Sequence, residues 1–359
     1  MTCGRCWPVT LVLLLLLAAC GSKGGIAQTP EPTEAPITSS TTTINTSTTT
    51  TALPTTQSLA EPGEYPRCIP PDDRTAPITF LPNWEQGEVI DLERKEIEDR
   101  AGRPIELGTS YAPVEIVVRE ANSDSFELTW TLGEAFLDLD DISIPDSELL
   151  DQFLELAKMR FEYETDETGL FLGVTNPDEI ADRMETAMDL LIEITGESLT
   201  EGQGIDVRSL MQSDTFIQTV ASQDIALYHG IYGLVLDPTQ IERYETLLPN
   251  AFGGEPFPAI QTIEVTSTAN EYGCVVVAMT TEPDPEAFVE ILMDSMPDSA
   301  APTTDEERAE LAEMEIRNDL EFIYDPDTGR MRQVSGTQTV SLGDDYRIET
   351  VILTEQPGS

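Results

Sequence analysis

The sequence predicts an α+β domain built on an antiparallel sheet over residues 65–356. Long segments rich in β-branched and aromatic residues come first, helical patterns follow, and strands return towards the end of the chain. Strands and helices therefore do not alternate one by one, as they would around a parallel sheet. The domain is about 290 residues long, which is enough to bury a substantial hydrophobic core.

The first three strands are expected at Glu88–Asp99, Tyr111–Ala121 and Phe126–Ala135. They are rich in Val, Ile, Leu, Tyr and Trp, which favour a pleated, half-buried surface. Gly, Pro, Asn and Ser separate them, and residues 122–125 (Asn-Ser-Asp-Ser) form a tight turn signal. This spacing predicts an antiparallel meander.

The clearest helix signal begins at Asn176, which can cap a helix whose first position suits Pro177. Apolar residues then recur at helical spacing until Gly196. Further helices are expected at Pro145–Ala157, about Asp206–Tyr228, Asp284–Met296 and Thr304–Arg317. The last of these begins with Thr304 and Glu307, the two ends of a capping box.

Later strands are expected at Ile260–Ala269, Gly273–Thr281, Leu320–Tyr324, Met331–Val340 and Tyr346–Thr354. Two segments, Phe161–Val174 and Glu321–Val334, each place an acidic residue, Thr and Gly between two alternating halves. The pattern predicts hairpins with Gly169 and Gly329 at positive φ, which Gly adopts without steric cost. A duplicated half-domain is an alternative interpretation of the repeated pattern.

The N-terminal segment, residues 1–19, has the layout of a secretory signal peptide. Its apolar run, Val9–Ala19, is about half as long as the ~20 residues that a membrane-spanning helix needs. The residues Leu17-Ala18-Ala19-Cys20 resemble the lipobox of bacterial lipoproteins. The resemblance implies cleavage before Cys20, lipidation of its thiol, acylation of the new amino terminus by a fatty acid such as palmitate, and attachment to the extracytoplasmic face of the cell membrane. An ordinary signal peptide followed by a chance Cys is the alternative.

Residues 20–64 are expected to form a disordered tether after the lipidated Cys20. Residues 29–58 contain 13 Thr, 4 Ser and 4 Pro, with no aromatic residue and no Gly. Such a segment buries too little apolar surface to offset the entropy lost on ordering. Its composition is also typical of O-glycosylated stalks, so it favours a spacer, with an unselected linker as the alternative.

The net charge of the chain is −48, from 19 basic and 67 acidic residues. This surface repels the phosphates of nucleic acids, so we expect no nucleic-acid partner. The lysines are Lys23, Lys95 and Lys158. An acid-rich, Lys-poor composition is typical of proteins in high salt, where screening weakens self-repulsion. An acidic surface that serves solubility alone is the alternative.

Two cysteines remain for the folded domain, because Cys3 and Cys6 lie in the signal segment and Cys20 is expected to carry lipid. They are Cys68 and Cys274. An exported protein meets an oxidising compartment, where such a pair is more often bonded than free. We therefore predict a Cys68–Cys274 disulfide that ties the start of the domain to a late strand.

Little in the sequence points to catalysis. His229 is the one histidine, and we expect it at a helix end with a carbonyl partner. No HExxH or GxSxG motif occurs. An EF-hand that starts at Asp325 would need Gly sixth and Glu twelfth, where the chain has Arg330 and Gly336. We therefore expect no enzyme activity, no cofactor and no metal; a carboxylate pair brought together by the fold is the alternative.

A long curved antiparallel sheet with helices packed on one face is similar in layout to the half-barrel lipoproteins of the bacterial envelope. In that family, lipids or apolar molecules lie between the concave sheet and its helices. The resemblance implies a lipid-anchored surface protein that binds an apolar or lipid-like ligand in that position. A non-catalytic structural or protein-interaction module of the cell envelope is the alternative.

Overall fold

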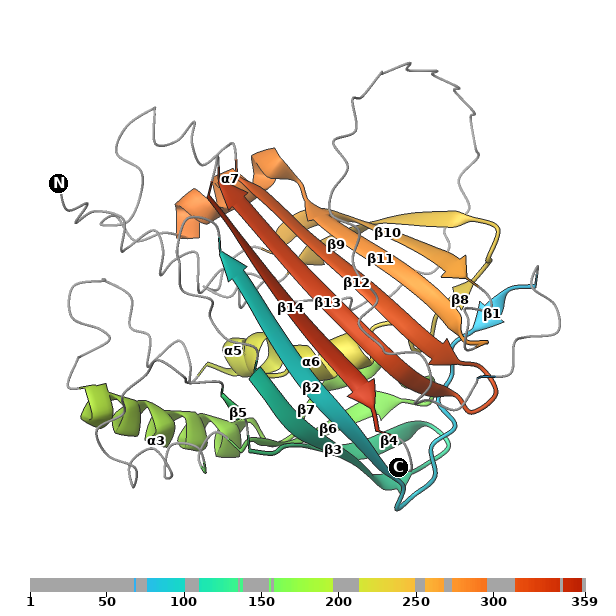
Figure 1. Ribbon diagram of the computed structural model, residues 1–359, viewed down its shortest axis with the longest axis horizontal. Helices are drawn as coiled ribbons and strands as arrows, with labels where there is room; N and C mark the ends of the chain where they lie inside the picture. Colours follow the sequence, from blue (N-terminus) through green and yellow to red (C-terminus); the bar gives the residue numbers. More distant parts are fainter. Residues whose placement is uncertain are drawn as a thin grey trace.

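The computed structural model describes residues 68, 76–100, 110–134, 136–137, 155, 158–195, 213–248, 256–267, 273–295, 314–342 and 345–356. Within these ranges an antiparallel sheet of 12 strands has helices on one face (Figure 1). The sheet is strongly twisted, as expected from the right-handed twist of each strand. The predicted α+β class, with a long antiparallel sheet and helices packed on one face, is confirmed.

Two meanders meet in the middle of this sheet. The first consists of β2 (Val89–Arg100), β3 (Ser110–Ala121), β4 (Ser125–Leu132), β6 (Arg160–Asp166) and β7 (Phe171–Val174), with the short β5 (Phe136–Leu137) paired to β3. The second consists of β9 (Ile241–Leu248), β10 (Phe257–Ser267), β11 (Val275–Pro283), β12 (Glu315–Asp325), β13 (Arg330–Leu342) and β14 (Asp345–Glu355). β2 pairs with β14 from Leu92 opposite Glu355 to Arg100 opposite Arg347, which joins the two halves of the domain.

The helices are α3 (Pro177–Thr195), α5 (Asp214–Phe216), the π-helix η1 (Ile217–Ala221), α6 (Gln223–Tyr228) and α7 (Pro285–Ser295) in the described part of the chain. α3 begins where Pro177 predicts a helix start. The helix expected over about Asp206–Tyr228 is confirmed from Asp214 onward, but it is interrupted at Ser222, whose hydroxyl donates to the Gln218 carbonyl. A short strand pair, β1 (Ile78–Thr79) with β8 (Val235–Leu236), lies apart from the main sheet.

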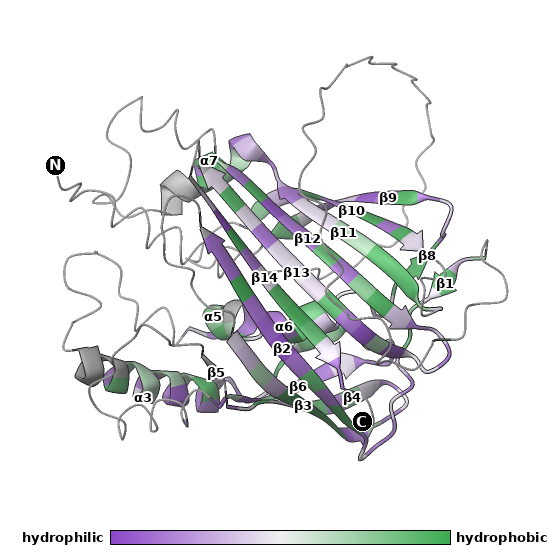
Figure 2. Cartoon of the chain, viewed as in Figure 1, coloured by the Kyte–Doolittle hydropathy of each residue, from purple (hydrophilic) through white to green (hydrophobic). Residues whose placement is uncertain are grey.

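Residue alternation separates the two faces of the sheet. On β3, Ala112, Val114, Ile116 and Val118 are buried, and the residues between them are more exposed. We call the face that carries these four side chains the inner face; α6 packs against it. Figure 2 shows hydrophobic and hydrophilic bands alternating along strands such as β2 and β14. The core lies between the inner face and the helices.

The predicted hairpins are present, and both glycines adopt the expected conformation. Gly169 has φ +87° in the β6–β7 turn, and Gly329 has φ +68° in the β12–β13 turn. A Cβ atom at Gly329 would lie 2.7 Å from the Leu81 carbonyl oxygen. Glycine is therefore required there both by the backbone conformation and by the close approach of the chain before β2.

The helix expected at Thr304–Arg317 is wrong at its end, because β12 begins at Glu315. From Ile316 to Tyr324 every second side chain is buried, and the segment pairs with β11 and β13 on its two sides. This period of two, together with two pairing partners, makes Glu315–Arg317 part of a strand where the helix was expected to end. Residues 304–313 lie outside the described residues.

Several predictions fall on residues that the structure does not describe. They are the signal segment 1–19, the lipidated Cys20, the tether 20–64 and the helix at Pro145–Ala157, of which Glu155 alone is described, in a helical conformation. In the described ranges, no helix has both the length and the apolar composition needed to cross a membrane.

Candidate functional site

A row of polar side chains crosses the inner face of the sheet. Residues that lie directly opposite one another on successive strands are Glu98, Glu349, Gln338, Asn318, Thr281, Gln261 and Tyr244. We call them the polar row. Four of them, Gln338, Asn318, Thr281 and Gln261, are no more than 9% exposed. The polar row therefore runs through the buried interior, although its two ends are more accessible.

Apolar residues flank the polar row on both sides. The row on one side includes Leu320, Met279 and Ile263, and the row on the other includes Val340, Ile316 and Ala259. All of these side chains are buried. A chain that needed only a hydrophobic core would not require polar groups between two such rows, because a buried polar group is costly wherever one of its hydrogen bonds is missing.

Members of the polar row bond to one another. Gln338 Nε2 donates to Asn318 Oδ1 over 3.1 Å. Gln261 Nε2 donates to Thr281 Oγ1 over 3.4 Å and lies 3.1 Å from the sulfur of Met279. These contacts fix the orientation of the amide groups, so the row presents defined donors and acceptors rather than rotating side chains.

A pocket of about 50 Å³ lies where the polar row passes beside α6. Its lining includes Gln223, Asp224 and Leu227 of α6, together with Asn318, Gln338 and Glu349 of the polar row. Gly336 makes room for the helix, because a Cβ atom there would lie 3.3 Å from the Leu227 methyl carbons. The side-chain oxygen of Gln223 is buried and accepts no hydrogen bond from a described residue. The pocket therefore contains an acceptor that a bound donor would satisfy.

Two arginines stand near this pocket, each between two carboxylates. Arg94 lies 2.6 Å from Asp224 and 2.7 Å from Glu96, and Arg347 lies 2.6 Å from Glu98 and 2.9 Å from Glu349. Burial raises the pKa of Glu349 above its usual value; Arg347 opposes this shift, and Glu96 and Glu98 add to it. With four carboxylates against two guanidinium groups, this end of the inner face favours hydrogen-bond donors and cations over anions.

His229 lies at the other side of α6 and is fully enclosed, with 1% of its surface exposed. Its Nδ1 donates to the Gly169 carbonyl oxygen over 2.8 Å, and its Nε2 accepts from the Tyr163 hydroxyl over 3.1 Å. Burial lowers the pKa of His229 to about 4, although the bond to the Gly169 carbonyl opposes the shift. The expected histidine at a helix end with a carbonyl partner is confirmed.

Aromatic side chains fill the space around His229. The rings of Trp84, Tyr163, Tyr228 and Tyr232 lie with centroids 5.2–5.8 Å from that of the histidine. Such tilted and edge-on contacts add stability beyond the area that they bury. These rings pack closely around His229, whereas the pocket lies on the polar-row side of α6.

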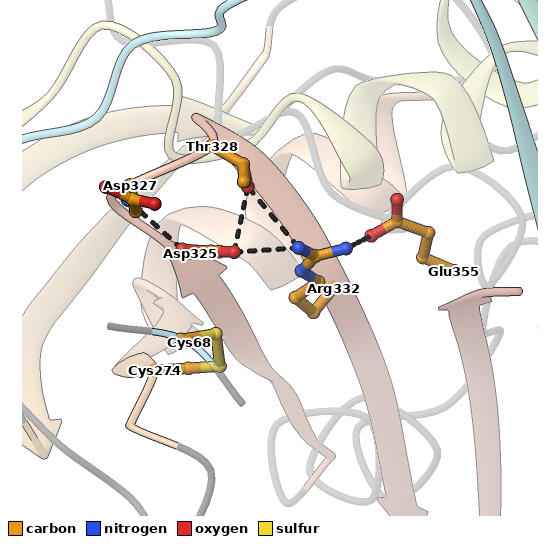
Figure 3. Close-up of a disulfide and its surroundings, with 7 residues drawn as sticks. All are labelled: Cys68, Cys274, Asp325, Asp327, Thr328, Arg332 and Glu355. Carbon is orange, nitrogen blue, oxygen red and sulfur yellow. Dashed lines mark hydrogen bonds and ion pairs between the residues drawn. A yellow bond between two sulfur atoms is a disulfide. The ribbon is translucent and has the colours of Figure 1, made fainter. Parts of the chain in front are cut away.

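A second charged cluster lies beside the β12–β13 turn (Figure 3). Arg332 lies 2.6 Å from Glu355 and 2.7 Å from Asp325, and both carboxylates are almost completely buried. Arg330 also pairs with Glu355 and with Glu88. These bonds connect β13 to β14 and to the segment before β2, which indicates a structural role.

The Asp325–Gly329 segment forms a turn that its own side chains stabilise. Asp325 accepts hydrogen bonds from the backbone amide of Asp327 and the hydroxyl of Thr328, besides its pair with Arg332 (Figure 3). Burial raises the pKa of Asp325, but these hydrogen bonds outweigh that effect and hold it below its usual value. Among the described residues, no cluster of three or more His, Cys, Asp or Glu could hold a metal ion.

The structure brings Cys68 and Cys274 together in a disulfide with a Cα–Cα distance of 4.9 Å (Figure 3). Both residues are buried. Cys274 directly precedes β11, so the bond fastens the beginning of the domain to the sheet. Cys20, the predicted lipidation site, lies outside the described residues.

The sequence contains a signal for the polar row. Asn318 follows Ile316 and precedes Leu320 at alternate positions of one strand, and Gln338 stands in the same relation to Val340. A polar residue at an inward position of an alternating strand departs from the apolar pattern of that face, and it therefore indicates a candidate binding site. The pairing register is still needed to place such residues next to one another.

No protein-family model matches the chain, and no curated protein matches it. One solved structure, described as "Lipid-protein interactions in lipovitellin", is similar over 77% of this chain, with a TM-score of 0.34 and 10% sequence identity. The match covers 26% of that protein's chain, so this chain spans about a quarter of its length.

Proposed function

We propose that this chain is a lipid-anchored protein on the extracytoplasmic face of the cell membrane, and that it binds a largely apolar ligand with one polar group between the sheet and α6. The polar row carries the proposal, because it places oriented polar groups between two buried apolar rows. Ligand sites in proteins have this composition, with apolar walls and a few convergent polar groups that fix orientation.

The polar end of the ligand is assigned to the pocket beside α6. Gln223, Asp224 and Glu349 supply acceptors there, so a hydroxyl, amide or amine group fits and an anionic head group does not. The pocket of about 50 Å³ takes a head group only, since pockets for whole drug-sized ligands measure ~300–1,000 Å³.

The apolar body of the ligand then lies along the rows that flank the polar row. Reaching them requires the helix layer to move away from the sheet, as lids do in other binding proteins. The helix that would move is preceded by the π-helix η1, a kind of segment that is frequent at functional sites. Ser222 separates the two and offers a position at which the direction of the chain can change.

Attachment to the membrane is supported by the resemblance of Leu17–Cys20 to the lipobox. Two or three acyl chains on Cys20 would hold the protein stably, whereas one chain would be marginal. We assign the site to binding rather than catalysis. Its carboxylates bond to Arg94 and Arg347, and His229 is enclosed on the far side of α6.

The experiment is native mass spectrometry of the full chain, released from its own membranes in a nonionic detergent. We expect a non-covalent mass that disappears on denaturation. Thermal unfolding in the presence of dodecanol, dodecylamine or dodecanoate then tests the head group, because a ligand that binds the folded state raises the melting temperature. The alcohol and the amine should raise it more than the acid.

Two variants of β13 test whether the rise in melting temperature comes from binding at the inner face. Gln338→Leu removes a member of the polar row and should reduce the shift with dodecanol. Thr339→Leu places the same side chain on the opposite face of β13 and should leave the shift unchanged. Absence of both a copurified mass and any shift would reject ligand binding and favour the second candidate.

That second candidate is a structural or protein-interaction module without a small ligand. The closely packed aromatic rings around His229 favour it, because they fill one end of the space between sheet and helices.

A further inference from the structure

β9 forms one edge of the described sheet and exposes three large apolar side chains beside its charged residues. Among the described strands it pairs with β10 alone. Ile241, Tyr244 and Leu247 are 67%, 44% and 55% exposed. An edge strand offers unpaired backbone amides and carbonyls, and proteins usually protect such edges by making them short or charged. β7, at the other edge, has only four residues.

Two charged residues on β9, Arg243 and Glu245, are exposed and form no ion pair with another described residue. Both side chains point to the face opposite the inner face, where Ile241 and Leu247 also lie. That face of β9 therefore carries, in order, an apolar residue, a base, an acid and an apolar residue.

Two copies of one strand can pair antiparallel in only a few registers. In an antiparallel pair, two directly opposite residues either both point their backbone N–H and C=O groups towards the other strand or both point them away from it. The two arrangements alternate along each strand. A residue can therefore lie opposite only residues an even number of positions away in the sequence. The twofold axis of such a pair passes through a residue, which lies opposite its own copy.

An axis at Tyr244 makes β9 complementary to itself. Arg243 then lies opposite Glu245 of the second copy, and Glu245 lies opposite Arg243. Ile241 lies opposite Leu247 on the same face, and the two Tyr244 rings meet on the inner face. Opposite charges and aromatic pairs at directly opposed positions stabilise a sheet, and apolar side chains opposite one another shield each other from water.

Other registers are unfavourable. An axis at Glu242, Arg243 or Glu245 sets a charged residue directly opposite its own copy, which destabilises a sheet. An axis at Thr246 places Glu245 opposite Leu247 and leaves the beginning of β9 without a partner. Among the registers centred within Glu242–Thr246, which pair most of β9 with its own copy, the charge pattern therefore selects the one at Tyr244.

We propose that a second copy of this chain binds along β9 and continues the sheet across a twofold axis at Tyr244. Such an interface uses the same patch on both subunits, and backbone hydrogen bonds between the edges supply much of its stability. β9 contributes eight residues per subunit, whereas stable complexes bury ~1,200–2,000 Å² with ~20–30 residues on each side. The dimer is therefore weak, and its fraction depends on the protein concentration.

Salt strengthens this dimer. A net charge of −48 on each chain opposes association when screening is weak. The Debye length falls from ~30 Å at 0.01 M to ~3 Å at 1 M salt, which removes repulsion between the bodies of the two chains. The Arg243–Glu245 pairs are in direct contact across the interface, so salt weakens their attraction less than it weakens the long-range repulsion.

The first test is sedimentation of the full chain in a nonionic detergent at low and high salt. We expect a dimer fraction that rises with protein concentration and with salt. Arg243→Glu and Glu245→Arg should each reduce the dimer at least tenfold in association constant, because each sets like charges opposite one another. The double variant should restore it. Arg119→Glu, on an exposed position of β3 within the sheet, is the matched control and should have no effect.

The second test fixes the register by cross-linking. Tyr244→Cys should give a disulfide-linked dimer on oxidation, because directly opposite Cα atoms lie ~4.5–5.5 Å apart, within the range of a disulfide. Ile241→Cys alone should not, since its partner is Leu247. A chain that is monomeric under all conditions, a dimer that tolerates both single charge variants, or a double variant that stays monomeric would each overturn the proposal.

Discussion

His229 and Gly169 are joined by a hydrogen bond of 2.8 Å between the imidazole Nδ1 and the carbonyl oxygen, which ties the end of α6 to the turn between β6 and β7. Because Tyr163 donates to the other ring nitrogen, both nitrogens are satisfied while the ring is neutral. The neutral histidine is therefore part of the folded core, and protonating it opposes folding.

Stability should fall as the pH drops from about 6.5 to about 4. Burial lowers the pKa of His229 from 6.5 to about 4, so within this window the unfolded chain binds a proton that the folded chain does not. The free energy of unfolding then decreases by up to ~1.4 kcal/mol per pH unit, or about 3 kcal/mol in all. Urea unfolding of wild type and His229→Gln across this range measures it. Equal slopes for the two chains would show that His229 is not the cause.

Gly169→Ala should destabilise the protein more than Gly87→Ala does. Both residues have positive φ, +87° and +85°, so a side chain strains the backbone at either position by ~1–2 kcal/mol. A Cβ atom at Gly169 would also lie 2.9 Å from a ring carbon of Pro82, whereas nothing lies within 4 Å at Gly87. Overpacking of this kind adds ~1–3 kcal/mol. The midpoints of urea unfolding of the two variants measure the loss of stability in each. Similar midpoints would contradict the steric explanation.

Glu355→Gln should cost about 3–5 kcal/mol in the free energy of unfolding. Glu355 is 3% exposed and bonds to both Arg330 and Arg332, so the variant leaves two partly buried guanidinium groups with fewer charges to balance them. Glu162→Gln is the control. It breaks a pair with Arg160 in which both side chains are 46% exposed, and such pairs contribute below ~1 kcal/mol. Equal losses would show that burial does not decide the cost.

Strands with one apolar face were predictable from the sequence, because alternation alone assigns them. The strand expected at Tyr111–Ala121 is an example, since its alternate buried residues reproduce the pattern. β9 was not predicted, because Ile241–Leu248 mixes charged and apolar residues on both faces and has no apolar face to detect. An edge strand is defined by its neighbour, and that information is not local.

The candidate site could not be predicted from the sequence, because it too depends on which strands are neighbours. Its residues come from seven strands, and a shift of one residue in any pairing would move a member of the polar row to the other face. Asn318 and Gln338 are twenty positions apart in the sequence, and only the register of β12 with β13 makes them neighbours. His229 could be assigned from its sequence position, because a helix end supplies the local context.

Acylation of Cys20 should be detectable by metabolic labelling with an alkyne fatty acid. The lipobox resemblance of Leu17–Cys20 motivates the prediction. Wild type should incorporate the label, and Cys20→Ser should not. Cys6→Ser is the matched control and should label fully, because Cys6 lies in the segment expected to be removed. Equal labelling of wild type and Cys20→Ser would reject the anchor.

The disulfide should make a large contribution to stability, because Cys68 and Cys274 are separated by 206 positions. In the chain-entropy model a cross-link over so long a loop restricts the unfolded chain strongly, and removing a native bridge typically costs ~2–5 kcal/mol. For a domain of this size that corresponds to a fall in melting temperature of roughly 5–15 °C. Thermal unfolding of Cys274→Ala, compared with wild type, measures this loss of stability. Thiol titration of the denatured, unreduced wild-type chain should find neither Cys68 nor Cys274 free. Because both side chains are buried in the folded protein, the titration has to be done after denaturation. Two reactive thiols in protein recovered from the cell surface would show that the bond does not form there, and an unchanged melting temperature would show that it forms without stabilising the domain.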